Sequence, residues 1–328
     1  MEQVRVGVVG SGWIAGRHIG NLQSFADVKI VAVADPVFER ACDQARRCDA
    51  NAYAGIQELL DREQVDAVYI CVPPLAHGPI EDTLIEHKLP FFVEKPLATD
   101  LATAESIAER VAAQGLVTAV GYHWRYLDTT ERAQELLSGN SARLALGYWL
   151  DFTPPPAWWA RRSQSGGQMV EQTTHIFDLA RLLVGDVTEV YGIGSSIPRP
   201  QFPDADVFDV SLATLRFRSG AAGNMASTCL LAWPHRIGLH LFGDGFAIEM
   251  SEREMTVRTG EHATAAYGAA VDPFLLEDRA FIDAVQGKEN RIRASYAEAL
   301  KTHRITIAAE ESARSGQIVR LQEEAVRV

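Results

Sequence analysis

The sequence predicts an α/β protein with a doubly wound parallel sheet, followed by a second α/β domain with a mainly antiparallel sheet. Short apolar runs alternate with helix-like segments over residues 1–121, and a glycine-rich turn follows the first run. Beyond residue 122, several strand-like runs succeed one another without helices between them. A chain of 328 residues is also long for one domain, so we expect two, 1–121 and 122–328.

The first domain is predicted from apolar runs without polar alternation, as expected for parallel strands that are covered on both faces. These runs are residues 4–9, 29–34, 66–72, 91–94 and 117–121. The helix-like segments between them are 13–25, 37–47, 56–63, 77–87 and 99–114. Thr99 is the expected N-cap of the last of these helices.

The second domain begins with a predicted strand at 142–152 and a helix within 166–184, which Gly185 should end. Six further strands are expected at 188–196, 207–217, 221–233, 236–242, 246–250 and 255–259. Two helices, 273–286 and 296–315, close the chain.

Composition excludes several classes of partner. The formal net charge of −12 argues against nucleic acid or an anionic membrane, since both require a basic face. No apolar run is long enough to span a membrane, and no signal-peptide pattern precedes the first strand, so we expect a cytoplasmic protein. Four cysteines form no C-x-x-C pair and are expected to be reduced structural thiols: Cys42, Cys48, Cys71 and Cys229.

Residues 10–15, GSGWIA, match the pattern G-x-G-x-x-G/A directly after a strand and at the start of a helix. Gly10 permits a tight turn, Gly12 allows a pyrophosphate to approach the backbone, and a small third residue permits close helix–strand packing. The start of the helix, with Trp13 and Ile14, favours phosphate charge. The alternative is a glycine-rich turn without a ligand.

The second strand ends in Asp35, whose carboxylate can accept hydrogen bonds from a ribose 2′-hydroxyl and repel a 2′-phosphate. This predicts NAD as the cofactor. Arg40 lies nearby and leaves NADP possible. Alternatively, Asp35 is an ordinary turn residue before Pro36.

Glu94, Lys95 and Pro96 follow the fourth apolar run, at a carboxyl end where ligands bind in this architecture. A lysine there can hydrogen-bond a reacting oxygen or take part in proton transfer, and the proline stiffens its turn. The alternative is a surface lysine in a loop.

Glu171 and His175 stand four residues apart, which places them on one helix face. A carboxylate beside an imidazole can orient it as a general base for an alcohol. A surface pair or a buried structural histidine is an equally good interpretation. A metal is not expected, since there is no H-E-x-x-H pattern and no cysteine set nearby.

Two tryptophans and two arginines, Trp158, Trp159, Arg161 and Arg162, precede this segment. Aromatic faces with arginines suit stacking on a sugar ring and hydrogen bonding to its hydroxyls. Core and loop packing explain them equally well, and the same holds for Tyr122, His123 and Trp124.

Several motifs occur together in one order: residues 10–15, 73–77, 94–96, 121–126, 166–178 and the helix 299–316. In this set the whole chain resembles the Gfo/Idh/MocA oxidoreductase family. The resemblance implies a Rossmann domain, a substrate domain with an open sheet, and hydride transfer between NAD(P) and a hydroxyl or carbonyl carbon of a sugar, cyclitol or related polyol.

The resemblance also implies residue roles. Lys95 matches the active-site lysine and His175 the catalytic histidine, while Glu171 stands where aspartate is usual and is one methylene longer. Arg125 matches an arginine of the substrate pocket. Pro73 and His77 match positions that line the cofactor groove.

Two other functions compete with a dehydrogenase: an NAD-assisted glycoside hydrolase, and a cofactor-binding regulator without catalysis. The presence of both Lys95 and His175 argues against the regulator. We also expect a homo-oligomer, a dimer or tetramer, because the helices of the second domain are too few to cover both faces of its sheet.

Overall fold

The computed structural model describes residues 3–261 and 264–322, which form two units. The first contains the residues up to Ala98, Ala102–Tyr126 and Asp272–Leu300. The second contains Thr99–Leu101, Leu127–Val271 and the residues from Lys301 on. The domain boundary expected after residue 121 stays a prediction, and the structure adds that Asp272–Leu300 belongs to the first unit.

The sheet of the first unit has six strands: β1 (Val4–Val9), β2 (Val28–Ala34), β3 (Asn51–Tyr53), β4 (Ala67–Ile70), β5 (Phe91–Val93) and β6 (Thr118–Val120). They are all parallel, in the order β3-β2-β1-β4-β5-β6. This order confirms the predicted doubly wound sheet, which binds ligands beyond its carboxyl ends beside β1. Strand β3 was not predicted, because it is a three-residue edge strand that contains an exposed asparagine.

The helices that accompany this sheet are α1 (Trp13–Gln23), α2 (Phe38–Cys48), α3 (Ile56–Arg62), α4 (Pro79–Glu86), α5 (Leu101–Gln114) and α10 (Pro273–Val285). Two 3-10 turns, η1 (Pro74–Ala76) and η2 (His123–Tyr126), follow β4 and β6. The N-cap prediction for Thr99 is wrong: α5 begins at Leu101, so Asp100, an equally good capping residue type, directly precedes it.

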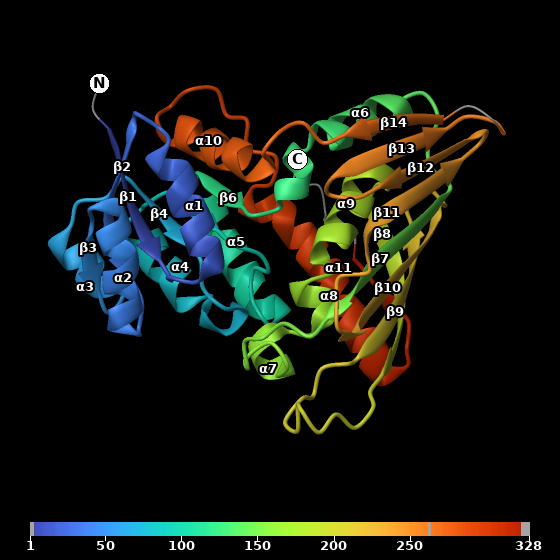
Figure 1. The fold of residues 1–328 in the computed structure, drawn as a ribbon, viewed down its shortest axis with the longest axis horizontal. Coiled ribbons are helices and arrows are strands. Elements are labelled where there is room, and N and C mark those ends of the chain that lie inside the picture. Colours follow the sequence, from blue (N-terminus) through green and yellow to red (C-terminus); the bar gives the residue numbers. More distant parts are fainter. Residues whose placement is uncertain (1–2, 262–263, 323–328) are drawn as a thin grey trace. The chain divides into compact units, whose positions relative to one another are not determined.

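The second unit contains a nine-stranded sheet (Figure 1). Its strands are β7 (Leu144–Phe152), β8 (Val187–Ser195), β9 (Val210–Phe217), β10 (Ala222–Leu231), β11 (Arg236–Gly243), β12 (Phe246–Met250), β13 (Glu254–Arg258), β14 (Thr264–Gly268) and β15 (Val319–Arg320). Their order is β14-β13-β12-β11-β7-β10-β9-β8-β15, and only the central pair β7–β10 is parallel among the strands described. The mainly antiparallel sheet is therefore confirmed, with two short edge strands, β14 and β15, that the sequence did not indicate.

Helices α8 (Gln168–Glu171), α9 (Thr174–Val184) and α11 (Tyr296–Ser315) lie against one face of this sheet, α11 with its residues from Lys301 on (Figure 1). The contact of α11 is close, because a Cβ at Gly192 of β8 would stand 2.4 Å from the carbonyl oxygen of Ala309. Helices α6 (Asp128–Leu137) and α7 (Arg162–Ser165) complete the unit. Helix α6 was not predicted, because its buried side includes two threonines and only two apolar residues.

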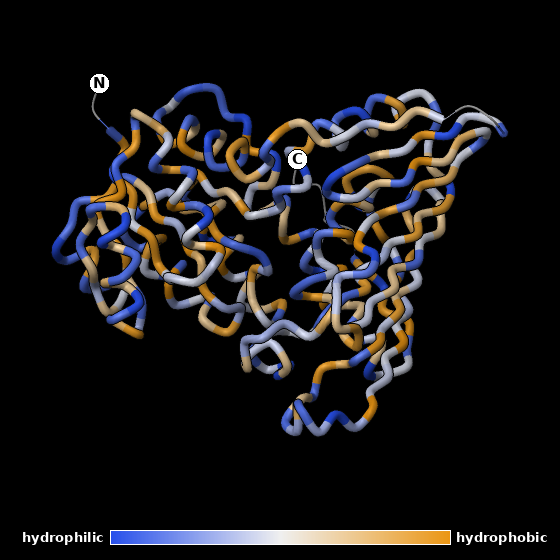
Figure 2. Tube along the Cα trace, viewed as in Figure 1, coloured by the Kyte–Doolittle hydropathy of each residue, from blue (hydrophilic) through white to orange (hydrophobic). Residues whose placement is uncertain are grey.

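The core of the first unit is built from β1, β2, β4 and α1, and it includes Phe281 and Ile282 of α10. Hydrophobic residues follow these strands in Figure 2, whereas hydrophilic residues dominate the loops. The burial of Phe281 and Ile282 explains why α10 belongs to this unit although it follows the second sheet in sequence.

Candidate active site

The glycine-rich loop joins β1 to α1 as predicted. Gly10 has φ +96°, and a Cβ there would stand 2.1 Å from the carbonyl oxygen of Cys71, so only glycine fits. A Cβ at Gly12 would meet nothing within 4 Å, which leaves the backbone open to a ligand. Ala15 is fully buried, as expected for the small residue between helix and strand.

The N-terminus of α1 is suited to an anion. Gly12 is its N-cap, no side chain among the described residues caps its first turn, and that turn contains no acidic residue. The first amide groups of the helix and its dipole are therefore available to a phosphate. Trp13, the first helical residue, has a side chain that is 80% exposed. The open backbone and the uncapped helix fit the diphosphate of a dinucleotide.

Asp35 ends β2 beside this loop, as predicted, and its carboxylate is buried and oriented. Its Oδ2 accepts hydrogen bonds from the amide of Ser11 at 3.0 Å and from the Ser11 hydroxyl at 2.6 Å. Its Oδ1 accepts one from the amide of Val37 at 2.8 Å. These three bonds leave limited acceptor capacity, so a ribose hydroxyl would have to share Oδ1 or displace the Ser11 hydroxyl.

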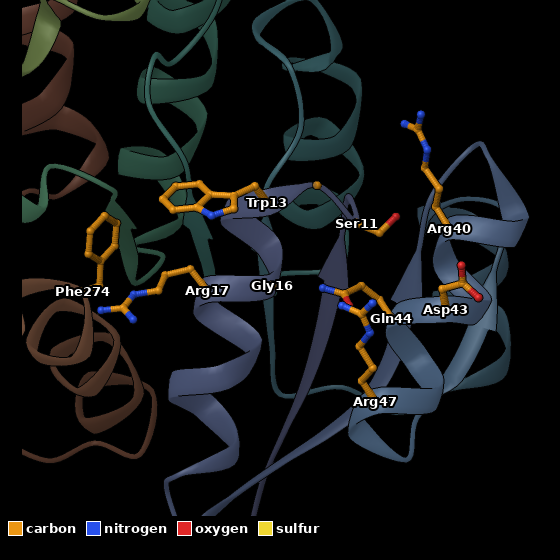
Figure 3. A pocket seen from close by; sticks show the side chains of 10 residues that line it. Ser11, Trp13, Gly16, Arg17, Arg40, Asp43, Gln44, Arg47 and Phe274 are labelled. Carbon is orange, nitrogen blue, oxygen red and sulfur yellow. The ribbon is translucent and has the colours of Figure 1, made fainter. Parts of the chain in front are cut away.

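A cavity of about 840 Å³ lies over α1 and α2, and Figure 3 shows the side chains that line it. Three arginines line this cavity: Arg17 from α1, and Arg40 and Arg47 from α2. The remaining lining residues are Ser11, Gly12, Trp13, Gly16, Asp43, Gln44 and Phe274. Arg40 thus lies in the same cavity as Ser11 and could contact a phosphate there.

Pro73 and His77 flank η1, after β4. His77 is buried, and its Nδ1 lies 2.6 Å from Oε1 of Glu81, whose Oε2 accepts from the amide of Gly78 at 2.6 Å. These bonds fix the imidazole within the first unit. Nε2 of His77 has no hydrogen-bond partner in the described part of the chain.

Glu94 and Lys95 directly follow β5, at the predicted carboxyl end. The Glu94 side chain turns inward, where its Oε1 lies 3.0 Å from Nε2 of His18, while Lys95 is partly exposed. A Cβ at Gly121 would stand 2.3 Å from Oε1 of Glu94, so glycine leaves the space that this carboxylate occupies. Sequence reasoning missed His18, because a single histidine after the glycine loop carries no pattern of its own.

The prediction that Glu171 and His175 share one helix face is wrong, because the segment is not one helix. Helix α8 ends at Glu171 and α9 begins at Thr174. Between them the amide of Thr173 donates to the carbonyl of Gln168, five residues back, at 3.0 Å. The regular helical spacing is therefore interrupted between the two side chains.

Each of these two side chains has a defined neighbour within the second unit. Nε1 of Trp159 donates to Oε2 of Glu171 at 2.7 Å. The His175 ring stacks on Trp149 of β7, with ring centroids 5.8 Å apart. The break between α8 and α9 is anchored to β10, since the hydroxyls of Thr173 and Ser227 lie 2.7 Å apart. Trp149 is a further residue that the sequence did not single out.

The expected substrate residues lie in different settings. Arg125 is buried in the first unit, where its Nη1 donates to the carbonyl of Arg293 at 2.7 Å and lies 3.4 Å from Oε1 of Glu298. Arg161 is exposed and bonds Asp204 at 2.9 Å. Trp158 packs against the buried cluster that contains Trp159. Core packing thus accounts for Trp159.

The geometry defines a dinucleotide-binding domain joined to a second unit that presents an imidazole and a carboxylate. Family comparison agrees. Residues 4–122 match the model of the GFO/IDH/MocA oxidoreductase family with an NAD-binding Rossmann fold, and residues 140–249 match the C-terminal domain of the same family. The chain belongs to the GFO/IDH/MocA family of oxidoreductases. It is therefore a nicotinamide-dependent enzyme with NAD as its cofactor.

The chain is similar to two curated inositol dehydrogenases. It is 29% identical to a scyllo-inositol 2-dehydrogenase (NAD(+)) of Bacillus subtilis over 74% of this chain and 72% of that protein. It is 28% identical to a myo-inositol 2-dehydrogenase of Thermotoga maritima over 91% and 86% of the two chains.

The fold is also that of a levoglucosan dehydrogenase solved with NADH, with a TM-score of 0.89 at 20% identity over 98% of this chain and 100% of that one. Among the described residues, no helix has the length and apolar character needed to cross a membrane.

Proposed function

We propose that the protein transfers hydride between NAD and a CH–OH carbon of a cyclitol, sugar or related polyol. The observation that carries this proposal is the open Gly12 backbone at the uncapped N-terminus of α1, beside the buried carboxylate of Asp35. The two inositol dehydrogenases among its relatives support the class of substrate. In oxidation, the nicotinamide accepts the hydride and a protein group takes the hydroxyl proton.

The proposed catalytic residues are Lys95, His175 and Glu171. His175 is the general base that accepts the hydroxyl proton, since imidazole is the side chain best suited to that role near neutral pH. Lys95 hydrogen-bonds the same oxygen and stabilises the negative charge that develops on it. Glu171, held by Trp159, stabilises the positive charge that His175 acquires.

The proposed cofactor residues all belong to the first unit: Gly10, Gly12, Trp13, Ile14, Asp35, Arg40, Pro73, His77, Glu94 and Lys95. Asp35 favours NAD over NADP because its carboxylate repels a 2′-phosphate. Arg40 supplies the opposite charge in the same region, which leaves some use of NADP.

For the substrate we propose contacts from Lys95, His175, Trp158 and Arg161. Trp158 has a partly exposed aromatic ring. Arg161 is exposed, and its guanidinium group has five N–H donors. Arg125 is proposed for the same pocket, as the family resemblance implies. Its side chain is buried and contacts the carbonyl of Arg293 and Oε1 of Glu298 within the first unit.

We also propose a cytoplasmic homo-oligomer. The four cysteines are free thiols, which suits a reducing compartment.

The sheet face opposite α8, α9 and α11 presents apolar side chains on adjacent strands, with Ile193 of β8 paired to Leu212 of β9 and both exposed. Tyr191, Val210, Leu230 and Leu144 are exposed on the same sheet. A second copy of the chain is the occupant we propose for this face.

A panel of inositols, sugars and sugar acids tested with NAD and NADP decides between the functions. A dehydrogenase produces reduced nicotinamide in proportion to substrate, read by its absorbance. Products formed from a glycoside without net reduction would instead indicate the NAD-assisted hydrolase. Binding of NAD without turnover on the whole panel would indicate a regulator and contradict the proposal.

A further inference from the structure

A buried group of polar side chains in the first unit is not used by the mechanism above. It joins α1, β5 and α10, and we refer to it as the His18 cluster: His18, Asn21, Glu94, Glu277 and Asp278. His18 and Asp278 have fully buried side chains, and the Glu94 side chain is 7% exposed. Burying this many ionisable groups is costly unless they are paired, so the cluster calls for a functional explanation.

His18 connects two of the carboxylates. Its Nδ1 lies 2.7 Å from Oδ1 of Asp278, and its Nε2 lies 3.0 Å from Oε1 of Glu94. Asn21, one helical turn further along α1, donates to Oδ2 of Asp278 at 2.8 Å. With a carboxylate at each ring nitrogen, both nitrogens act as donors only when the imidazole carries its proton.

The charges around His18 favour its protonated form. Burial alone lowers the pKa of His18, but the charge and hydrogen bond of Asp278, followed by those of Glu94, outweigh it and raise that pKa well above its usual value. Glu277 of α10 belongs to the same cluster, and burial raises its pKa well above the ordinary range.

Two further titratable groups come from β4 and the residue after it. His18 lies 5.5 Å from the ring of Tyr69, measured between ring centroids. Burial raises the pKa of both Tyr69 and Cys71 well above their usual values, so both are neutral. Asp278 and Glu94 are the two carboxyl groups that contact the His18 ring.

The fixed carboxylate lies next to the active-site lysine in the chain. Glu94 and Lys95 are consecutive and directly follow β5, which ends at Val93. The Glu94 side chain is buried, whereas Lys95 is partly exposed. The inward Glu94 side chain is held by His18 and fills the space left by Gly121. A displacement of Glu94 would therefore move the backbone that carries Lys95.

We propose that His18 is a positioning residue for hydride transfer: bridging Asp278 and Glu94, it fixes the Glu94 carboxylate and through it the backbone that presents Lys95. This inference rests on the proposed function, which assigns Lys95 to the reacting oxygen. A misplacement of about 1 Å at such a group costs up to roughly a hundredfold in rate, so a buried support can matter as much as a direct contact.

The first test uses the protein without cofactor or substrate. Histidine side chains are labelled with ¹³C and ¹⁵N, and the His18 signal is assigned by its loss in His18→Gln. We expect imidazolium shifts to persist well above the usual histidine pKa of 6.5, and the Asp278→Asn variant to lose them at a lower pH than the wild type does. A wild-type His18 that is neutral at pH 7 would overturn the proposal.

The second test is a kinetic cycle of His18→Gln, Glu94→Gln and the double variant. Each single change should lower kcat by about tenfold or more, and His18→Gln should leave the KM for NAD within about twofold of wild type. In the Glu94→Gln background, His18→Gln should add less than about a twofold loss, because the residue acts through Glu94.

Leu22→Ala is the matched control, because Leu22 is a fully buried residue of the same helix outside the cluster. It should lower Tm while leaving kcat and the KM for NAD within about twofold of wild type. If it lowers kcat as much as His18→Gln does, or if the His18 and Glu94 losses multiply independently, the positioning role is wrong. Should His18→Gln fail to fold, the Asp278→Asn and Glu94→Gln pair provides the same cycle. Failure of the proposed function is seen separately, as a Lys95→Ala variant with normal turnover.

Discussion

Ser11 and Asp35 are joined by two hydrogen bonds, from the amide at 3.0 Å and from the hydroxyl at 2.6 Å, both to Oδ2 of the carboxylate. The pair links the glycine-rich loop to the end of β2, and the bond from Val37 holds the second oxygen. The carboxylate is therefore oriented before any ligand binds, and its charge lies next to the first turn of α1.

Asp35→Ser should relax the preference for NAD. The change removes the negative charge that repels a 2′-phosphate, while Arg40 remains in the adjacent cavity. We expect the ratio of kcat/KM values for NAD and NADP to fall by about tenfold, which corresponds to 1.4 kcal/mol. Ser11→Ala, which keeps the charge and loses one hydrogen bond, should retain the preference. A wild-type enzyme that uses NADP better than NAD would contradict this interpretation of Asp35.

Lys95→Ala and His175→Ala should each lower kcat by roughly a hundredfold or more, the usual scale for a positioned acid–base group. Both should bind NAD nearly normally, because the loop at Gly12 and the Asp35 carboxylate are unchanged. Fluorescence titration with NADH measures binding, and stopped-flow absorbance measures turnover. A His175→Ala enzyme with near-normal kcat and an unchanged pH profile would remove His175 from the mechanism.

Glu171→Gln should reduce kcat less than either of those changes and should move the pH optimum. A glutamine keeps an acceptor for Trp159 Nε1 but lacks the charge that stabilises a protonated imidazole. Trp159→Phe is the complementary variant, since it keeps the charge and removes the donor. If Glu171→Gln has the same pH optimum as wild type, Glu171 serves only to hold Trp159.

Short sequence patterns correctly predicted those parts of the fold that require particular residue types at particular positions. The glycine loop and Asp35 lie where the sequence placed them, because a tight turn, a helix start and a strand end need particular residue types. Strand β3 and helix α6 were missed, because a three-residue edge strand and a helix with a narrow apolar side give little periodic signal. The single helix expected through Glu171 and His175 was wrong, because tertiary contacts such as Thr173–Ser227 determine that break.

The His18 cluster could not be predicted from the sequence for a different reason. His18 and Asp278 are 260 residues apart in sequence, and each alone is an unremarkable residue of a helix. Only the return of α10 to the first unit brings them together. No single-sequence pattern encodes a pairing over that distance, so the support behind Lys95 could be found only in the structure.

Replacing Leu212 by Asp should disrupt the oligomer. Leu212 is exposed on β9, where it pairs with Ile193 on β8 and with Ala226 on β10. A buried carboxylate at a self-associating face is costly, so multi-angle light scattering should show a monomer at micromolar concentration. Leu276→Asp, at an exposed apolar residue of α10, is the control and should leave the mass unchanged. A monomeric wild type would exclude the proposed interface.

Glu310 should make the stability of the protein depend on pH. It lies on α11 beneath Gly167, where a Cβ would stand 2.4 Å from its Oε1. Burial raises the pKa of Glu310 from 4.5 to about 7, against the opposing effects of Arg314, the Met169 backbone and Arg162. The folded state therefore holds this proton more tightly than the unfolded state does. Its stabilising contribution is complete below pH 4.5 and is lost as the pH rises to about 7.

Glu310→Gln removes this dependence, because an amide has no proton to lose. Relative to wild type, we expect the free energy of unfolding to increase at pH 8 by up to about 3 kcal/mol and to change little at pH 4.5. Urea unfolding at the two pH values measures the difference. Glu311→Gln, at the exposed neighbouring position, is the matched control and should follow the wild type. If Glu310→Gln and wild type lose the same stability between the two pH values, Glu310 does not titrate in this range.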